Sequence, residues 1–299
     1  MENKISIVPD DKSHWLKLRH KNVNSTEVSC LYDANPYQTH FELYHYKRSE
    51  DIPSIEETEP MKWGSRLQNS IAYGVAQDRG WDKIREMKEY VYLPDTQLGS
   101  SFDFEVNGNE ILEIKNVSER VYGKSWTEDE APAHIEMQVQ TQMLVSGYRK
   151  AWICALVGGN QVHLIERNYM PSVGESILKK VKHFWTRTDE PKIDYERDAE
   201  FIRSLYQNVD PNKIIEGDET LLALAQRYNA LASQISLAEN QKKAVQAQIL
   251  MMAGDAEKVK HEKFTLSLGM VKESFIAAHT RAARRNFRLT MKAGENNGN

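Results

Sequence analysis

The chain has 299 residues, of which 40% are hydrophobic and 27% are charged, and its formal net charge is −4. This is the composition of a globular protein with one large domain or two smaller ones, and it excludes a wholly disordered or fibrous chain. The sequence lacks an apolar run of the roughly 20 residues that cross a membrane, a signal peptide and a paired-cysteine motif, so we expect a cytoplasmic protein without a membrane partner.

The hydrophobic periodicity changes several times along the first two-thirds of the chain. Helical spacing predicts helices within 1–48 and over 61–81, 133–147, 173–186 and 194–207. Alternating or continuous apolar runs predict strands over 89–93, 101–106, 110–115, 151–157 and 161–166. Asn107-Gly108 predicts a tight hairpin turn between the second and third of these strands. This order of elements indicates a mixed α/β core that ends near residue 208.

The remaining residues, 209–299, are expected to form a helical extension. Apolar residues recur in steps of three and four, with a break at Lys242, and this predicts a coiled-coil-like heptad helix over about 219–252. Because its apolar stripe needs a cover, we expect residues 271–286 to return along it. The C-terminal segment is basic and contains four arginines, Arg281, Arg284, Arg285 and Arg288. These arginines would either bind the phosphates of the DNA backbone or form an ordinary solvent-exposed face.

Three ionisable residues are grouped on the predicted hairpin. Glu113 and Lys115 are two positions apart on one strand and therefore leave the same face, and Asp103 lies on the partner strand. Two carboxylates suit Mg²⁺ or Mn²⁺, and a lysine beside such an ion suits the activation of water at a phosphodiester. Taken alone, the same three residues also fit the polar face of an ordinary strand, so the pattern leaves two interpretations open.

Several short motifs follow one another between Trp15 and Trp185. In chain order they are Trp15-Leu-Lys-Leu-Arg19, Val23-Asn-Ser-Thr-Glu-Val28, Asn35-Pro-Tyr37, Trp63-Gly-Ser-Arg-Leu-Gln68, then Asp103, Glu113 and Lys115, and finally Glu136-Met-Gln-Val-Gln140. In this order and at these spacings the chain resembles the lambda-exonuclease/YqaJ-like viral recombinase nucleases of the PD-(D/E)XK superfamily. The resemblance implies a restriction-endonuclease-like mixed sheet core flanked by helices, forming a nuclease domain over residues 1–208.

The resemblance also implies an active site. Asp103, Glu113 and the carbonyl of Ile114 would hold Mg²⁺, which Mn²⁺ would replace. Lys115 would orient or deprotonate the attacking water, and Gln140 would position that water or Lys115.

At the DNA end, the resemblance implies that Arg19 and Thr26 bind the 5′-phosphate of double-stranded DNA. Digestion would run from 5′ to 3′ and leave 3′ single strands for a single-strand annealing partner in phage-type recombination. The protein would be a homo-oligomer, a trimer by resemblance, of phage or prophage origin in the cytoplasm of a bacterial host.

One position departs from the family pattern. Gln68 stands where the family has a helical glutamate, and a glutamine brings an oxygen but no charge to a metal ion. A second metal ion would then be weakly held, unless Glu57 or Glu59 does the work instead. The departure motivates an alternative function, a DNA-end-binding recombination scaffold with weak or no catalysis. A third possibility is a site-specific endonuclease of the same superfamily.

Overall fold

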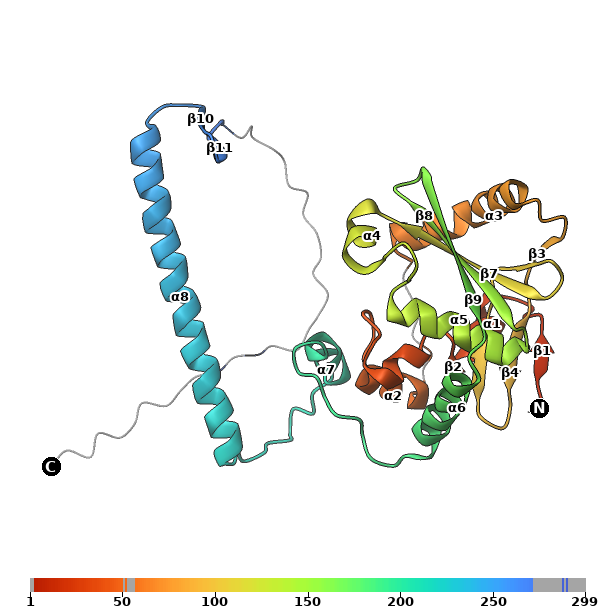
Figure 1. Cartoon of the computed structure of the whole chain (residues 1–299). Helices are drawn as coiled ribbons and strands as arrows, with labels where there is room; N and C mark the ends of the chain where they lie inside the picture. Colours follow the sequence, from red (N-terminus) through yellow and green to blue (C-terminus); the bar gives the residue numbers. More distant parts are fainter. Residues whose placement is uncertain (1–2, 51, 53–56, 271–286, 288, 290–299) are drawn as a thin grey trace. The chain divides into compact units, whose positions relative to one another are not determined.

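The computed structural model describes residues 3–50, 52, 57–270, 287 and 289 (Figure 1). The chain divides into two compact units, Met1–Ile202 and Arg203–Asn299, where the sequence analysis placed the boundary at residue 208. None of the helices in the described part of the chain combines the length and the apolar composition that a membrane crossing requires.

The first unit alternates strands and helices. Its helices are α1 (Lys12–His20), a 3₁₀ helix (Val28–Tyr32), α2 (His40–Arg48), α3 (Glu59–Arg79), α4 (Glu119–Ser125), α5 (Ala133–Ser146) and α6 (Pro171–Thr186), while α7 (Ala199–Leu205) spans the boundary between the units. Its strands are β1 (Ile5–Ile7), β2 (Val23–Asn24), β3 (Ile84–Glu86), β4 (Tyr90–Leu93), β5 (Leu98–Ser100), β6 (Phe104–Val106), β7 (Glu110–Val117), β8 (Lys150–Val157) and β9 (Gln161–Asn168). The mixed α/β architecture predicted from the sequence is confirmed.

The strands form two sheets in this unit. The larger sheet has the order β3-β6-β7-β8-β9, in which β7 and β8 are parallel and the other neighbours are antiparallel. The smaller sheet has the order β1-β4-β5-β2. The parallel strands β7 and β8 are joined by a crossover that contains α4 and α5, as a parallel connection requires.

The first 48 residues are less helical than the sequence predicted. The short strands β1 and β2 lie in this region, and their partners are distant in sequence, because Ile5 pairs with Tyr92 and Val23 pairs with Leu98. Strands of two or three residues carry no measurable alternation, so only the tertiary pairing reveals them. The predicted strand at 101–106 is likewise shorter, since β6 begins only at Phe104.

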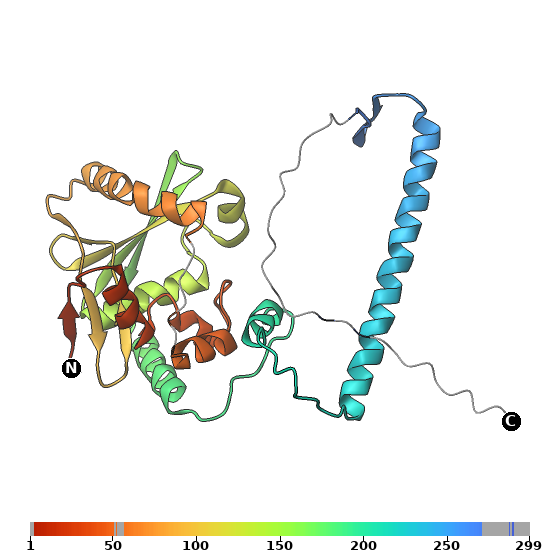
Figure 2. The same ribbon diagram turned by 180° about the vertical axis from the view of Figure 1, so that it is seen from behind.

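Each face of the larger sheet covers its own hydrophobic core. Leu112 and Ile114 of β7 pack with residues of α3, including Ile71 and Val75. Ile111 of the same strand belongs to the other core, which contains α5 and α6. Figure 2 shows α3 and α5 separated by the sheet when the molecule is seen from behind. The two-residue alternation of β7 therefore directs Glu113 and Lys115, which share the face of Ile111, toward α5.

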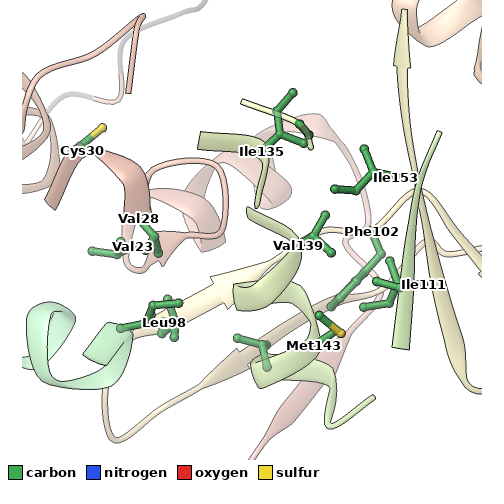
Figure 3. Packing of buried hydrophobic residues seen from close by; sticks show 14 of the residues in the cluster. Val23, Val28, Cys30, Leu98, Phe102, Ile111, Ile135, Val139, Met143 and Ile153 are labelled. Carbon is green, nitrogen blue, oxygen red and sulfur yellow. The ribbon is translucent and has the colours of Figure 1, made fainter. Parts of the chain in front are cut away.

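Helix α5 is packed tightly into this second core. Its residues Val139 and Met143 point toward Phe102, Ile111 and Ile153 of the neighbouring strands and loop (Figure 3). All five of these side chains are at most 5% exposed. This packing fixes the rotation of α5 about its axis and hence which of its polar residues reach Glu113.

The second unit contains the long helix α8 (Glu219–Ala253), which matches the predicted heptad helix, and no described residue of α8 is buried. A two-stranded hairpin of β10 (Lys258–His261) and β11 (Phe264–Ser267) follows it. The predicted return segment 271–286 lies outside the described residues. So do the candidate DNA-binding arginines, Arg281, Arg284, Arg285 and Arg288.

Candidate active site

The hairpin between β6 and β7 places Asp103 beside Glu113. Asn107 and Gly108 both adopt positive φ angles, 55° and 81°, as a turn of this kind requires. Phe104 pairs with Leu112, so Asp103, one residue before the ladder, comes opposite Glu113, one residue beyond Leu112. Asp103 Oδ2 accepts a hydrogen bond of 2.7 Å from the amide of Ile114. The side chain of Asp103 thus accepts the hydrogen bond that a backbone carbonyl of a neighbouring strand would otherwise accept, and this holds Asp103 next to the start of β6.

Glu113 is a buried carboxylate, 3% exposed, and both of its oxygens accept hydrogen bonds. Oε1 accepts hydrogen bonds from Lys115 Nζ at 2.6 Å and from Gln138 Nε2 at 2.7 Å. Oε2 accepts from Gln142 Nε2 at 2.6 Å. A buried charge is costly unless it is paired and hydrogen-bonded, and this set of donors meets that requirement.

The structure places a different glutamine of α5 from the expected one beside Lys115. Gln138, and not Gln140, reaches Lys115, because its Oε1 accepts a hydrogen bond of 3.0 Å from Lys115 Nζ. The amide of Gln140 instead donates to the carbonyl of Asn168 and accepts from the backbone amide of Met170, both at 2.9 Å. Residues two apart on a helix face nearly opposite directions. Gln140 therefore ties α5 to the end of β9.

Gln142 is a site residue that the sequence analysis missed. It lies four positions after Gln138, so the two side chains share one face of α5 and both contact Glu113. Its Nε2 also lies 3.3 Å from the carbonyl of Ser101. The i,i+4 spacing of the two glutamines places them on one face of α5, but it does not show that this face meets Glu113.

Lys115 carries a firmly held positive charge. Burial by itself would lower the pKa of Lys115, but the carboxylates of Glu113 and then Asp103 outweigh burial and raise it. The ammonium is therefore protonated in the ion-free protein. Its side chain is 25% exposed and lines the cavity described below, so the charge is available to a bound molecule.

For Asp103, burial acts on the pKa in the opposite direction to its effect on Lys115. Burial, followed by repulsion from Glu113, raises the pKa of Asp103 to about 8. The Lys115 ammonium and the hydrogen bonds from the amide of Ile114 and from Gln68 lower the pKa of Asp103 but do not cancel the shift. Two adjacent carboxylates and one lysine ammonium leave the site with excess negative charge when both carboxylates are ionised, and a further cation would compensate it.

Gln68 of α3 is thus in contact with the site, as its match to the motif predicted. The two alternatives are engaged elsewhere, because Glu57 pairs with Lys12 and Glu59 pairs with Lys62. Ile114 contributes its amide to Asp103, and a role for its carbonyl stays a prediction.

The predicted phosphate-binding pair also meets. Arg19 Nη2 donates a hydrogen bond of 3.2 Å to Thr26 Oγ1, and the guanidinium lies 4.8 Å from the centre of the Trp15 ring. Glu27 lies beside it, 2.7 Å from the buried Lys47 ammonium and 4.0 Å from Arg19. Burial would raise the pKa of Glu27, but Lys47 and Arg19 together lower it. One carboxylate between two cations leaves a net positive charge that suits a phosphate.

A cavity of about 1050 Å³ is lined by residues of both clusters, Thr26 from the first and Lys115 from the second. Thr26 lines one part of it, Lys115 and Gln138 line another, and Tyr37 and His134 also form its wall. Thr26 and Lys115 therefore face the same cavity.

The residues present fit a hard divalent cation. Asp103 and Glu113 supply carboxylate oxygens, Gln68 lies against Asp103, and repulsion from Glu113 adds to burial in raising the pKa of Asp103. Among the described residues, no group of three or more histidine, cysteine, aspartate or glutamate side chains surrounds a common point. The two carboxylates would thus need neutral oxygens to complete the coordination of a hard ion.

Comparisons with solved structures define the fold class. The fold resembles that of an alkaline exonuclease, LHK-Exo from Laribacter hongkongensis, with a TM-score of 0.50, 16% identity, and coverage of 65% of this chain and 97% of that chain. A second structure of LHK-Exo, in complex with dAMP, matches with the same values. The described architecture is therefore an exonuclease-like fold.

Residues 14–149 match the model of the YqaJ-like viral recombinase domain. The Bacillus subtilis (strain 168) protein named "Uncharacterized protein YqaJ" is 28% identical over 256 residues, which cover 82% of this chain and 79% of the relative. The resemblance seen in the sequence is confirmed, since this part of the chain matches the YqaJ-like viral recombinase domain.

Proposed function

We propose that the protein is a Mg²⁺-dependent exodeoxyribonuclease that digests double-stranded DNA from its ends. The observation that carries the proposal is the convergence of Asp103, Glu113 and Lys115 beside a cavity that also reaches Thr26. The exonuclease-like fold and the YqaJ-like domain support the same class of reaction.

Asp103 and Glu113 would hold the magnesium ion, with Gln68 and the carbonyl of Ile114 as neutral oxygen ligands. When bound, the ion would neutralise charge on the phosphodiester and make water more acidic. Lys115 lies next to both carboxylates, so its ammonium orients the attacking water and stabilises the additional negative charge on the phosphate. Gln138 is hydrogen-bonded to Lys115 at 3.0 Å and to Glu113 at 2.7 Å, and these bonds fix the positions of the two side chains relative to each other.

Digestion from 5′ to 3′ is the second part of the proposal. The Arg19–Thr26 pair is the candidate anchor for a 5′-phosphate, and the cavity extends from Thr26 to Lys115. Such digestion would leave 3′ single strands for a single-strand annealing protein. A homo-oligomer, a trimer by family resemblance, would keep the enzyme on the DNA.

The deciding experiment compares blunt linear duplex with closed circular duplex of the same sequence, in Mg²⁺ and in excess chelator. We expect mononucleotides from the linear substrate in Mg²⁺ alone and an intact circle throughout. Binding of linear ends without any cleavage in Mg²⁺ or Mn²⁺ would favour the recombination scaffold. Cleavage of the circle would favour an endonuclease.

The pH dependence of metal binding follows from Asp103. Its pKa in the ion-free folded protein is about 8, above its ordinary value of 3.8, so an ion must displace a proton at neutral pH. The apparent Mg²⁺ affinity should rise by up to about tenfold per pH unit below pH 8 and level off above it. The raised pKa also means that the ion-free protein loses stability as the pH rises from about 4 through 8.

Thermal unfolding with and without Mg²⁺ measures both effects. We expect the stabilisation by Mg²⁺ to be larger at about pH 9 than at about pH 6, because the carboxylate is free of its proton only at the higher pH. An equal increase in the unfolding temperature at the two pH values would contradict this assignment.

Arg19 should determine the preference for phosphorylated ends. In Arg19→Ala, the ratio of cleavage rates on 5′-phosphorylated and 5′-hydroxyl duplexes should fall about tenfold or more, since a charged donor to phosphate is lost. Lys17→Ala is the matched control, because Lys17 is an exposed base on the same helix, and it should leave the ratio unchanged. A wild-type protein that cleaves both ends equally would remove the basis for this role.

A further inference from the structure

Tyr37 is an exposed aromatic residue on a rigid loop. Its side chain is 83% exposed, yet its backbone amide donates to Asn35 Oδ1 at 2.9 Å, as does the amide of Gln38 at 3.0 Å. Asn35 is buried, and its Nδ2 donates to the carbonyl of Thr26 at 3.1 Å and to Ser29 Oγ at 3.0 Å. The loop is thus fastened to the segment that carries Thr26, while the ring itself faces solvent.

A second ring lies beside it. His134, in the first turn of α5, meets Tyr37 edge to face, with ring centroids 5.8 Å apart and an interplanar angle of 87°. Burial and then the nearby Lys115 ammonium lower the pKa of His134, so the imidazole is neutral at neutral pH. The two rings, which stand nearly perpendicular to each other, form an uncharged aromatic part of the cavity wall.

The position of this surface indicates what it binds. Tyr37, His134, Thr26 and Lys115 line the same cavity. Phosphates are bound by cations, which the Arg19 and Lys115 clusters offer. A neutral aromatic surface near both clusters suits the flat face of a nucleobase, and such stacking tolerates every base because each has a π-face.

We propose that Tyr37, supported by His134, stacks on the base of the 5′-terminal nucleotide. The inference rests on the proposed exonuclease function and adds a binding subsite to it. The terminal nucleotide would then be held at its 5′-phosphate by Arg19 and Thr26, at its base by Tyr37, and at its 3′-phosphodiester beside Lys115. Tyr37 is a positioning residue, which sets how far the strand advances into the cavity before each cleavage.

The test pairs a change in the protein with a change in the DNA. Two 5′-phosphorylated blunt duplexes are compared, one intact and one that lacks only the base of the 5′-terminal nucleotide. Equilibrium binding is measured by fluorescence anisotropy in excess chelator, so that no cleavage occurs, and single-turnover cleavage is then measured in Mg²⁺. The proteins are the full-length wild type, Tyr37→Ala, Tyr37→Phe and Tyr195→Ala.

Loss of the terminal base should weaken binding by the wild type about tenfold. In Tyr37→Ala, the missing base should weaken binding less than about twofold. Tyr37→Phe keeps the ring and should show the same loss of binding as the wild type. Tyr195 is 74% exposed and is not among the residues that line the cavity, so Tyr195→Ala should retain the tenfold effect. Substitution of an exposed ring should leave the unfolding temperature unchanged, and this is checked for each variant.

Two results would overturn the stacking role. One is an equal effect of the missing base in the wild type and Tyr37→Ala while cleavage of the intact duplex proceeds, which refutes the subsite and leaves the nuclease function standing. The other is wild-type protein that neither binds nor cleaves duplex ends, which refutes the proposed function and the subsite together.

Discussion

Lys115→Ala should lower the single-turnover cleavage rate on the order of a thousandfold while DNA-end binding persists. The ammonium lies 2.6 Å from Glu113 Oε1 and is the cation nearest to the two carboxylates. Its removal takes away stabilisation of negative charge at the reacting phosphate, and the loss of one such group costs about 10²–10³ in rate. The rate is measured on 5′-phosphorylated linear duplex in saturating Mg²⁺, and binding is measured in chelator.

A matched control separates this effect from the loss of any salt bridge on the sheet. Lys150 also pairs with a glutamate, Glu166, at 3.0 Å, but it lies at the start of β8, away from the site. Lys150→Ala should cleave at the wild-type rate, since a partly exposed ion pair contributes little. Near-normal cleavage by Lys115→Ala would refute the role of the lysine.

Substitution of Gln138 should affect mainly the cleavage rate, whereas substitution of Gln140 should affect mainly the free energy of unfolding. Gln138→Ala should lower the cleavage rate about 10- to 100-fold, because a group that orients both Lys115 and Glu113 is lost, and supporting contacts of this kind have effects of that size. Gln140→Ala should keep the rate per folded molecule. Its free energy of unfolding should fall by about 1–3 kcal/mol, since the amide of Met170 and the carbonyl of Asn168 lose their partner.

Cleavage rates and urea unfolding of the two variants provide the measurement. The prediction fails if Gln140→Ala loses activity and Gln138→Ala does not, which would restore the original assignment from the motif. The comparison is informative because both residues are buried on the same helix and differ mainly in the direction that they face.

The amino-acid sequence by itself determined the central hairpin. Asn107-Gly108 is a turn signal with a local mechanism, because both residues accept positive φ angles. The alternation of β7 is also local, so the shared direction of Glu113 and Lys115 followed from their spacing of two. The meeting of Arg19 and Thr26 was predicted from the family motif, and the structure joins them by a hydrogen bond.

The tertiary structure alone decided which glutamine enters the site. Helix α5 is buried on nearly all sides, since Gln138, Val139, Gln140, Thr141 and Gln142 are all at most 7% exposed. A helix without an exposed polar face carries no signal for its rotation about its own axis. Val139 and Met143 pack against the sheet (Figure 3). Only this packing turns Gln138 and Gln142 toward Glu113. Strands β1 and β2 were not predicted either, because their hydrogen-bond partners lie more than 70 residues away in sequence.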